Sequence, residues 1–139
     1  DTPRLLEGFI VADGGRYVGL GRSQDLIREI TRLQAEAARY ANPLTQLPGN
    51  VPIAGHAERL LRAGVPFACC HVDLNHFRYY NQRYGYERGD QMIKLVGRVL
   101  DAVSQRDLDF LGHVGGDDFV MLMQSGDWER RLREALELF

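Results

Sequence analysis

Two glycines followed by two carboxylates, Gly115-Gly116-Asp117-Asp118, are the residues of this chain whose types and spacing most directly indicate chemistry. Short apolar runs flank them, which is typical of a β-hairpin whose glycines adopt the positive φ angles of a tight turn. Adjacent carboxylates repel each other, so a site that holds both favours a cation beside them. The hairpin is therefore a candidate site for a metal ion and a phosphate group.

A further acid, Asp73, ends the apolar run 67–72, which predicts a strand buried on both faces of a sheet. If this strand lies beside the hairpin, Asp73, Asp117 and the backbone carbonyl of Leu74 converge. Oxygen ligands in small number suit Mg²⁺, and a carboxylate pair that holds metal against a nucleotide is a common arrangement for phosphoryl transfer. The alternative is that Asp73 caps a following helix and that the turn acids are solvated.

The elements that must position these acids follow from the hydrophobic pattern after residue 67. The strand over 67–72 precedes a helix over about 88–104, the Gly-Gly hairpin, and a last helix that Asp127 caps. This order is the split β-α-β plan without its final strand, so we expect an α+β, ferredoxin-like sheet with flanking helices, in which the first and third strands are neighbours. The open edge of the first strand predicts that the natural chain continues past Phe139.

The N-terminal part has a pattern of its own. Residues 8–20 predict a hairpin, and Ser23 begins a helix that ends before Asn42-Pro43. Apolar side chains recur along this helix at spacings of four and three; they are Leu26, Ile30, Leu33, Ala37 and Tyr40. We interpret residues 1–41 as the tail of an upstream regulatory module with a connecting helix, and residues 42–139 as a second domain.

Bulk composition excludes several classes of function. The formal net charge of −2 gives no indication of a nucleic-acid-binding or anionic-membrane-binding surface. No apolar run approaches the roughly 20 residues that span a bilayer. The two cysteines, Cys69 and Cys70, are adjacent, so on a strand they point to opposite faces, and we expect two buried thiols rather than a disulfide. A reducing cytoplasm is the expected location.

Several motifs together resemble the GGDEF domain of diguanylate cyclases. They occur in the family's order within residues 42–139, and they are Leu44-Thr45-Gln46-Leu47-Pro48, Asp73-Leu74-Asn75-His76-Phe77-Arg78, Asn81, Gly85, Gly89-Asp90 and Gly115-Gly116-Asp117-Asp118-Phe119. The resemblance implies a palm-like fold related to nucleotidyl cyclases. It also implies a homodimer in which each subunit presents one GTP and two GTP molecules condense into cyclic di-GMP.

The resemblance further implies a role for each matching position. Mg²⁺ (or Mn²⁺) is expected on Asp73, Leu74 and Asp117, and the catalytic carboxylates are expected to be Asp117 and Asp118. Substrate contacts are expected from Phe77, Arg78, Asn81, Asp90, Gly115 and Gly116, with Asn81 and Asp90 on the guanine. An Arg-x-x-Asp inhibitory site for the product is expected at Arg106 and Asp109; the alternative there is an exposed turn with a surface ion pair.

The sequence also departs from the family pattern. Asp118 stands where glutamate is usual, His113 where an arginine is usual, and Asn42 and Gln46 where aspartate and glycine are usual; the family's phosphate-contacting C-terminal lysine segment is absent. Two functions therefore remain open. One is a diguanylate cyclase driven by an upstream sensory domain, and the other is an inactive receptor for GTP or cyclic di-GMP. Residues 8–34 also resemble the closing hairpin and helix of a CBS-type module.

Overall fold

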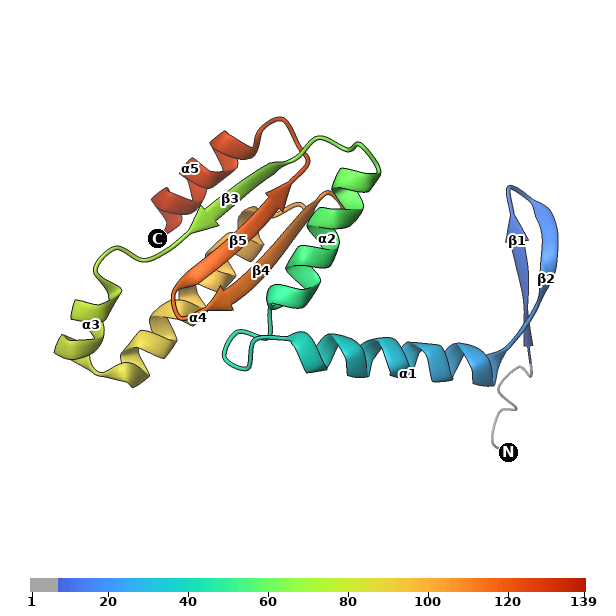
Figure 1. Ribbon diagram of the computed structural model, residues 1–139, viewed down its shortest axis with the longest axis horizontal. Coiled ribbons are helices and arrows are strands. Elements are labelled where there is room, and N and C mark those ends of the chain that lie inside the picture. Colours follow the sequence, from blue (N-terminus) through green and yellow to red (C-terminus); the bar gives the residue numbers. More distant parts are fainter. Residues whose placement is uncertain (1–7) are drawn as a thin grey trace. The chain divides into compact units, whose positions relative to one another are not determined.

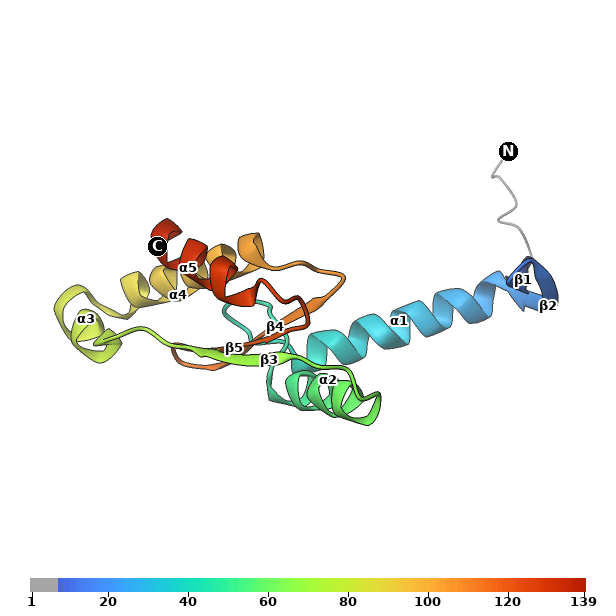
Figure 2. The same cartoon turned by 90° about the horizontal axis from the view of Figure 1, so that it is seen from above.

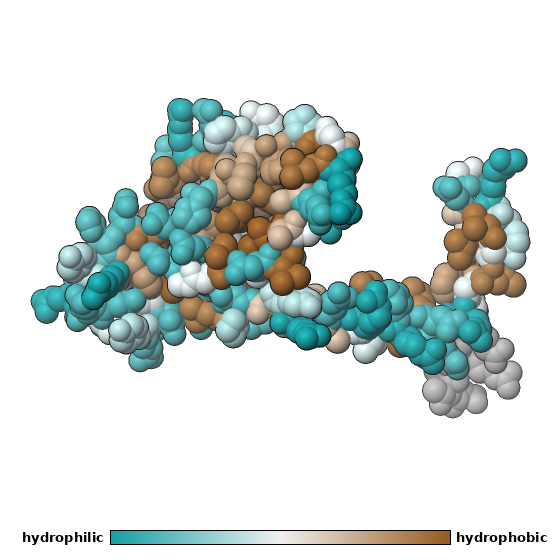
Figure 3. Space-filling view, viewed as in Figure 1, coloured by the Kyte–Doolittle hydropathy of each residue, from teal (hydrophilic) through white to brown (hydrophobic). Residues whose placement is uncertain are grey.

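The computed structural model describes residues 8–139, and the chain divides into two compact units, Asp1–Arg39 and Tyr40–Phe139. In the first, β1 (Gly8–Asp13) and β2 (Arg16–Arg22) form an antiparallel hairpin, and α1 (Ser23–Tyr40) follows (Figure 1). The predicted hairpin and helix are thereby confirmed. Strongly exposed apolar side chains occur on both strands, and Figure 3 shows them as an apolar surface; they include Ile10, Val18 and Leu20.

The second unit has the α+β architecture that the sequence predicts. Its elements are α2 (Asn50–Arg62), β3 (Ala68–Val72), α3 (Phe77–Tyr84), α4 (Tyr86–Val103), β4 (Asp109–Gly115), β5 (Asp118–Met123) and α5 (Trp128–Leu138). The three strands form an antiparallel sheet in the order β3-β5-β4. Helices α4 and α5 cover one face of this sheet and α2 lies on the other (Figure 2). The first strand of the domain is thus a neighbour of the third, as predicted.

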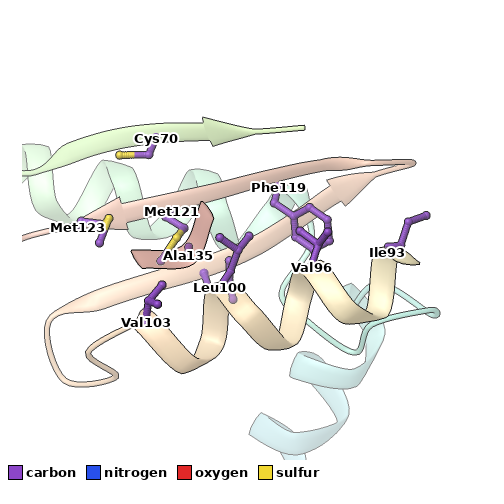
Figure 4. Packing of buried hydrophobic residues seen from close by; sticks show 10 residues of the cluster. Cys70, Ile93, Val96, Leu100, Val103, Phe119, Met121, Met123 and Ala135 are labelled. Carbon is purple, nitrogen blue, oxygen red and sulfur yellow. The ribbon is translucent and has the colours of Figure 1, made fainter. Parts of the chain in front are cut away.

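The core lies between the sheet and α4. Alternate residues of the central strand β5 point to α4, where apolar residues recur at helical spacing, and Figure 4 shows the two sets in contact. Those on β5 are Phe119, Met121 and Met123, and those on α4 are Ile93, Val96, Leu100 and Val103. This packing fixes α4, the helix that carries Asp90, against the strand that follows the candidate metal turn.

Strand β3 differs from the prediction that it is buried on both faces. Only Cys70 is buried there, while Cys69 and His71 are exposed. Among the described strands β3 pairs only with β5, so it is an edge strand, and α2, the helix on the other face of the sheet, packs mainly against β4 and leaves Cys69 and His71 uncovered. The two thiols do point to opposite faces, but only one is buried. Within residues 8–139, no helix has the length and apolar character needed to span a bilayer.

Candidate functional site

The twin-glycine turn joins β4 to β5 in a conformation that favours glycine. Gly115 and Gly116 have φ angles of 151° and 59°, and the ladder shifts register between His113 and Gly115. A Cβ added to either glycine would meet no heavy atom within 4 Å, so the backbone geometry, and not crowding, favours glycine here. Gly116 is exposed and Gly115, Asp117 and Asp118 are half-buried, so the backbone of the turn is accessible to solvent at Gly116.

Strand register brings the sequence-predicted acids to one end of the sheet. Val72 pairs with Phe119, so Asp73, the next residue after β3, lies beside the start of β5 at Asp118. Asp117 occupies the turn immediately before it. The convergence of Asp73 and Asp117 on one cation stays a prediction.

The donor set at this end of the sheet consists of oxygens suited to Mg²⁺. Within residues 8–139, no group of three or more histidine, cysteine or acidic side chains is arranged to hold a metal ion. Two carboxylates and the Leu74 carbonyl would therefore leave coordination positions for water and phosphate. Mg²⁺ commonly binds proteins in this way, through one or two carboxylates together with substrate phosphates. The residues present are compatible with that ion.

A groove of 480 Å³ opens beside the loop that follows β3. His71, Asp73, Leu74 and Asn75 line one side of it, and apolar residues of α4 and α5 line the other, among them Leu100. The groove places solvent-accessible space next to the candidate metal-binding loop.

A second part of the site lies where α3 meets α4. The sequence did not predict α3 as a separate helix; Gly85, with a φ of 89°, separates it from α4. Gly89 is buried, and an added Cβ would lie closer than 3.0 Å to the amide of Asn81. The close approach of α3 to α4 therefore depends on the absence of a side chain at Gly89.

Asn81 carries the clearest unsatisfied group of this region. Its Oδ1 atom is buried and has no hydrogen-bond partner among the described residues. An unpaired buried acceptor costs about 1–3 kcal/mol, which a ligand N–H can recover. Asp90, the next residue after Gly89, is exposed. An orphan acceptor and a nearby carboxylate are groups that can receive the ring N–H and amino group of guanine.

His113 joins the twin-glycine turn to the loop 44–48. Its side chain is 1% exposed and stacks on Phe119, with ring centroids 4.3 Å apart. Nε2 donates to the carbonyl of Gly116 at 3.0 Å, and Nδ1 lies 2.9 Å from Oγ1 of Thr45. The backbone N–H of His113 donates to the carbonyl of Pro48. His113 thereby connects the turn to the loop 44–48 through both ring nitrogens and its backbone N–H.

The other two departures, at Asn42 and Gln46, also have local structural contacts. Oδ1 of Asn42 accepts the backbone N–H groups of Leu44 and Thr45, a capping role that needs no negative charge. Gln46 has a φ of 62°, a left-handed conformation in which glycine is the favoured residue. Its side-chain amide donates to the carbonyl of Pro43 at 3.0 Å.

The structure engages the Asp109 carboxylate inside the fold. Its side chain is fully buried and forms an ion pair with Arg131 of α5, and Oδ2 also accepts the backbone N–H of Gln105. Arg106 is exposed and pairs instead with Asp101 at 2.8 Å. Arg106 and Asp109 therefore do not form a joint open site in this structure, because the Asp109 carboxylate is already engaged inside the fold.

The Arg131 guanidinium is held by the same buried cluster. Its hydrogen bond to Asp109 raises the pKa of Arg131, against the opposing effect of burial. It also donates to the carbonyl of Val103 and to Asp127. Asp127 makes no side-chain capping bond to α5, contrary to the sequence expectation, because Arg130 and Arg131 engage its carboxylate.

Comparison with known proteins gives a consistent result. Residues 39–137 match the family model described as "Diguanylate cyclase, GGDEF domain". A diguanylate cyclase of Vibrio cholerae is 28% identical over 118 residues, which cover 80% of this chain and 36% of that protein. The chain thus spans about a third of that relative.

Solved structures share the fold. The coiled coil and GGDEF domain of DgcB from Caulobacter crescentus, in complex with c-di-GMP, superposes with a TM-score of 0.66 at 23% identity, covering 81% of this chain and 64% of that chain. Diguanylate cyclase SiaD from Pseudomonas aeruginosa, in complex with its activator SiaC, gives a TM-score of 0.69 at 24% identity, covering 83% of this chain and 46% of that chain.

Proposed function

Because the chain belongs to the GGDEF family, we propose that residues 42–139 bind GTP and, as a homodimer with Mg²⁺ (or Mn²⁺), condense two GTP molecules into cyclic di-GMP. The family match, with Asp73 and Asp117 present at the motif positions, is the observation that carries the proposal. The 3′-hydroxyl of one GTP attacks the α-phosphorus of the other and releases pyrophosphate. The 3′-hydroxyl of the second GTP then attacks the α-phosphorus of the first, which releases a second pyrophosphate and closes the ring.

The roles of the side chains follow from their places in the fold. Asp73, the Leu74 carbonyl and Asp117 would hold a divalent ion, which would supply charge neutralisation at the phosphates and acidify the attacking 3′-hydroxyl. Asn81 and Asp90 accept hydrogen bonds from guanine. Gly115 and Gly116 let the triphosphate approach the turn backbone. Phe77 begins α3 after the loop that follows β3, and the exposed side chain of Arg78, the next residue, adds positive charge there.

A receptor role is the second candidate function. Asp118 is one methylene shorter than the usual glutamate, and a displacement of about 1 Å in a positioned group can cost about a hundredfold in rate. His113 lacks the permanent charge of arginine. Both changes weaken turnover more directly than binding, so a domain that binds GTP or cyclic di-GMP and signals to a partner is the alternative.

The first unit suggests how the domain is regulated. Leu26, Ile30 and Leu33 follow a heptad spacing on α1 and are exposed, which suits a parallel helix pair in the proposed homodimer. The exposed apolar side chains of β1 and β2 suit burial within an upstream, CBS-like module. We place the protein in the cytoplasm, where GTP is available.

Incubation of the purified protein with GTP and Mg²⁺, followed by chromatography for cyclic di-GMP and pyrophosphate, tests the proposal. Turnover that Asp117→Ala abolishes supports the cyclase. Calorimetric binding of GTP or cyclic di-GMP without turnover supports the receptor. Absence of both turnover and binding contradicts both functions. Recovery of activity in Asp118→Glu would assign a catalytic defect to the shortened carboxylate.

A further inference from the structure

A histidine on the edge strand contacts the second acid of the twin-glycine turn. Nε2 of His71 on β3 lies 2.9 Å from Oδ1 of Asp118 on β5. The two residues are 47 positions apart in the sequence, and the pattern of the chain gave no indication that they meet. The contact follows from the register, in which His71 pairs with Val120 and therefore lies diagonally across from Asp118 on the same face.

The fold does not depend on this contact. The side chains of His71 and Asp118 are 61% and 47% exposed, and exposed pairs of this kind contribute about 0–1 kcal/mol. Backbone pairing along the whole of β3 already joins it to β5, from Ala68 to Val72. The stability of the fold therefore does not explain the presence of a solvent-exposed histidine at this position.

Its surroundings connect it with the proposed reaction. Asp73 follows the last residue of β3 directly and lies two residues after His71. His71 and Asp73 also line the same 480 Å³ groove. The imidazole thus contacts the Asp118 carboxylate, and the same residue lines the groove next to Asp73.

We propose that His71 is a positioning residue for Asp118, an inference that rests on the proposed condensation of GTP. An aspartate carboxylate lies closer to its own strand than a glutamate carboxylate, and this brings it within reach of a side chain on β3. The Nε2–H group of His71 donates to Oδ1 and restricts the carboxylate to one orientation. Oδ2 has no hydrogen-bond partner in the part of the chain that the structure describes, so it stays available to a ligand.

The test compares variants that keep or remove the donor. His71→Ala removes it, whereas His71→Gln retains an amide N–H at a similar reach. Cys69→Ala, an exposed neighbour on the same face of β3, is the matched control. We expect His71→Ala to lower kcat by about tenfold to a hundredfold, with the KM and the calorimetric affinity for GTP within about twofold and Tm nearly unchanged. His71→Gln is expected to recover most of the loss.

A double-mutant cycle and a measurement without nucleotide complete the design. In an Asp118→Ala background, His71→Ala is expected to cause no further loss, because the two residues act together. In the ¹⁵N NMR spectrum of the nucleotide-free protein, the His71 ring signals are expected to show the Nε2–H tautomer and to shift in Asp118→Ala.

Wild-type turnover with unchanged kcat in His71→Ala would overturn the positioning role alone. Equal losses in His71→Ala, His71→Gln and Cys69→Ala, with a lower Tm, would also overturn it, since they would indicate a structural role. GTP binding without wild-type turnover would overturn both this role and the cyclase function. Absence of GTP binding would overturn the proposed function as a whole.

Discussion

The buried pair of Asp109 and Arg131 leads to a quantitative prediction about stability. The Asp109 side chain is 0% exposed and that of Arg131 is 5% exposed. Removal of one partner of such a pair leaves an uncompensated buried charge and costs about 3–5 kcal/mol. Val103 and Asp127 still accept hydrogen bonds from Arg131 in Asp109→Ala. We therefore expect this variant to lose about 3 kcal/mol of the free energy of unfolding, the lower end of that range. For a domain of this size that loss lowers Tm by about 12–24 °C.

Urea unfolding of four variants tests this reasoning. Asp109→Ala and Arg131→Met each leave one charge unpaired, whereas the double variant Asp109→Leu/Arg131→Met leaves none and is expected to recover most of the stability. Arg130→Met is the control, because Arg130 is exposed and its ion pair with Asp127 lies on the surface; we expect a change within about 0.5 kcal/mol.

A cost below about 1 kcal/mol for Asp109→Ala would refute the reasoning, since the value would fit a solvent-exposed carboxylate. If the same variant also abolished binding of cyclic di-GMP while it stayed folded, Asp109 would belong to the inhibitory site that the sequence suggested.

Three further predictions follow from single residues. Gly89→Ala is expected to weaken GTP binding in calorimetry by about tenfold or more, because the new Cβ displaces Asn81. Gly97→Ala is the control and is expected to bind GTP normally, since the nearest atom to its added Cβ lies at 3.4 Å. Equal affinities of the two variants would contradict this. Gln46→Gly is expected to raise the free energy of unfolding by about 0.5–1 kcal/mol through relief of its positive φ, and urea titration showing no gain would refute it. Burial lowers the pKa of His56 in the folded protein, so the unfolded chain binds a proton at a higher pH than the folded one does, and stability falls as the pH drops below 6.5. His56→Phe should reduce the fall in Tm measured from about pH 7 to about pH 5.5. An identical pH profile for the variant and the wild type would contradict this.

Local patterns were enough to predict much of the fold. Helical spacing indicated α4 and α5, and the glycine pair indicated the hairpin of β4 and β5, because both signals are contained in short segments. The order of elements also placed β3 beside β5. The sequence missed α3, whose eight residues are separated from α4 only by the conformation of Gly85.

Side-chain partners far apart in sequence could not be predicted in the same way. The contacts of Asp109 with Arg131 and of His71 with Asp118 join residues 22 and 47 positions apart, and they depend on register and rotamer as well as on composition. The Arg-x-x-Asp pattern indicated a ligand site at Asp109, but the final helix supplies a buried cation that takes the same carboxylate. The exposure of β3 was likewise missed, because an apolar run does not reveal how many strands pair with it.

A crystal structure of the protein with Mn²⁺ and a non-hydrolysable GTP analogue, with the ion located by anomalous scattering, tests the central claim most directly. We predict one ion bound by both Asp73 and Asp117 and by phosphate oxygens of the nucleotide, with the guanine at Asn81 and Asp90. An ion bound by only one of these acids, or a nucleotide bound away from the twin-glycine turn, would contradict the account.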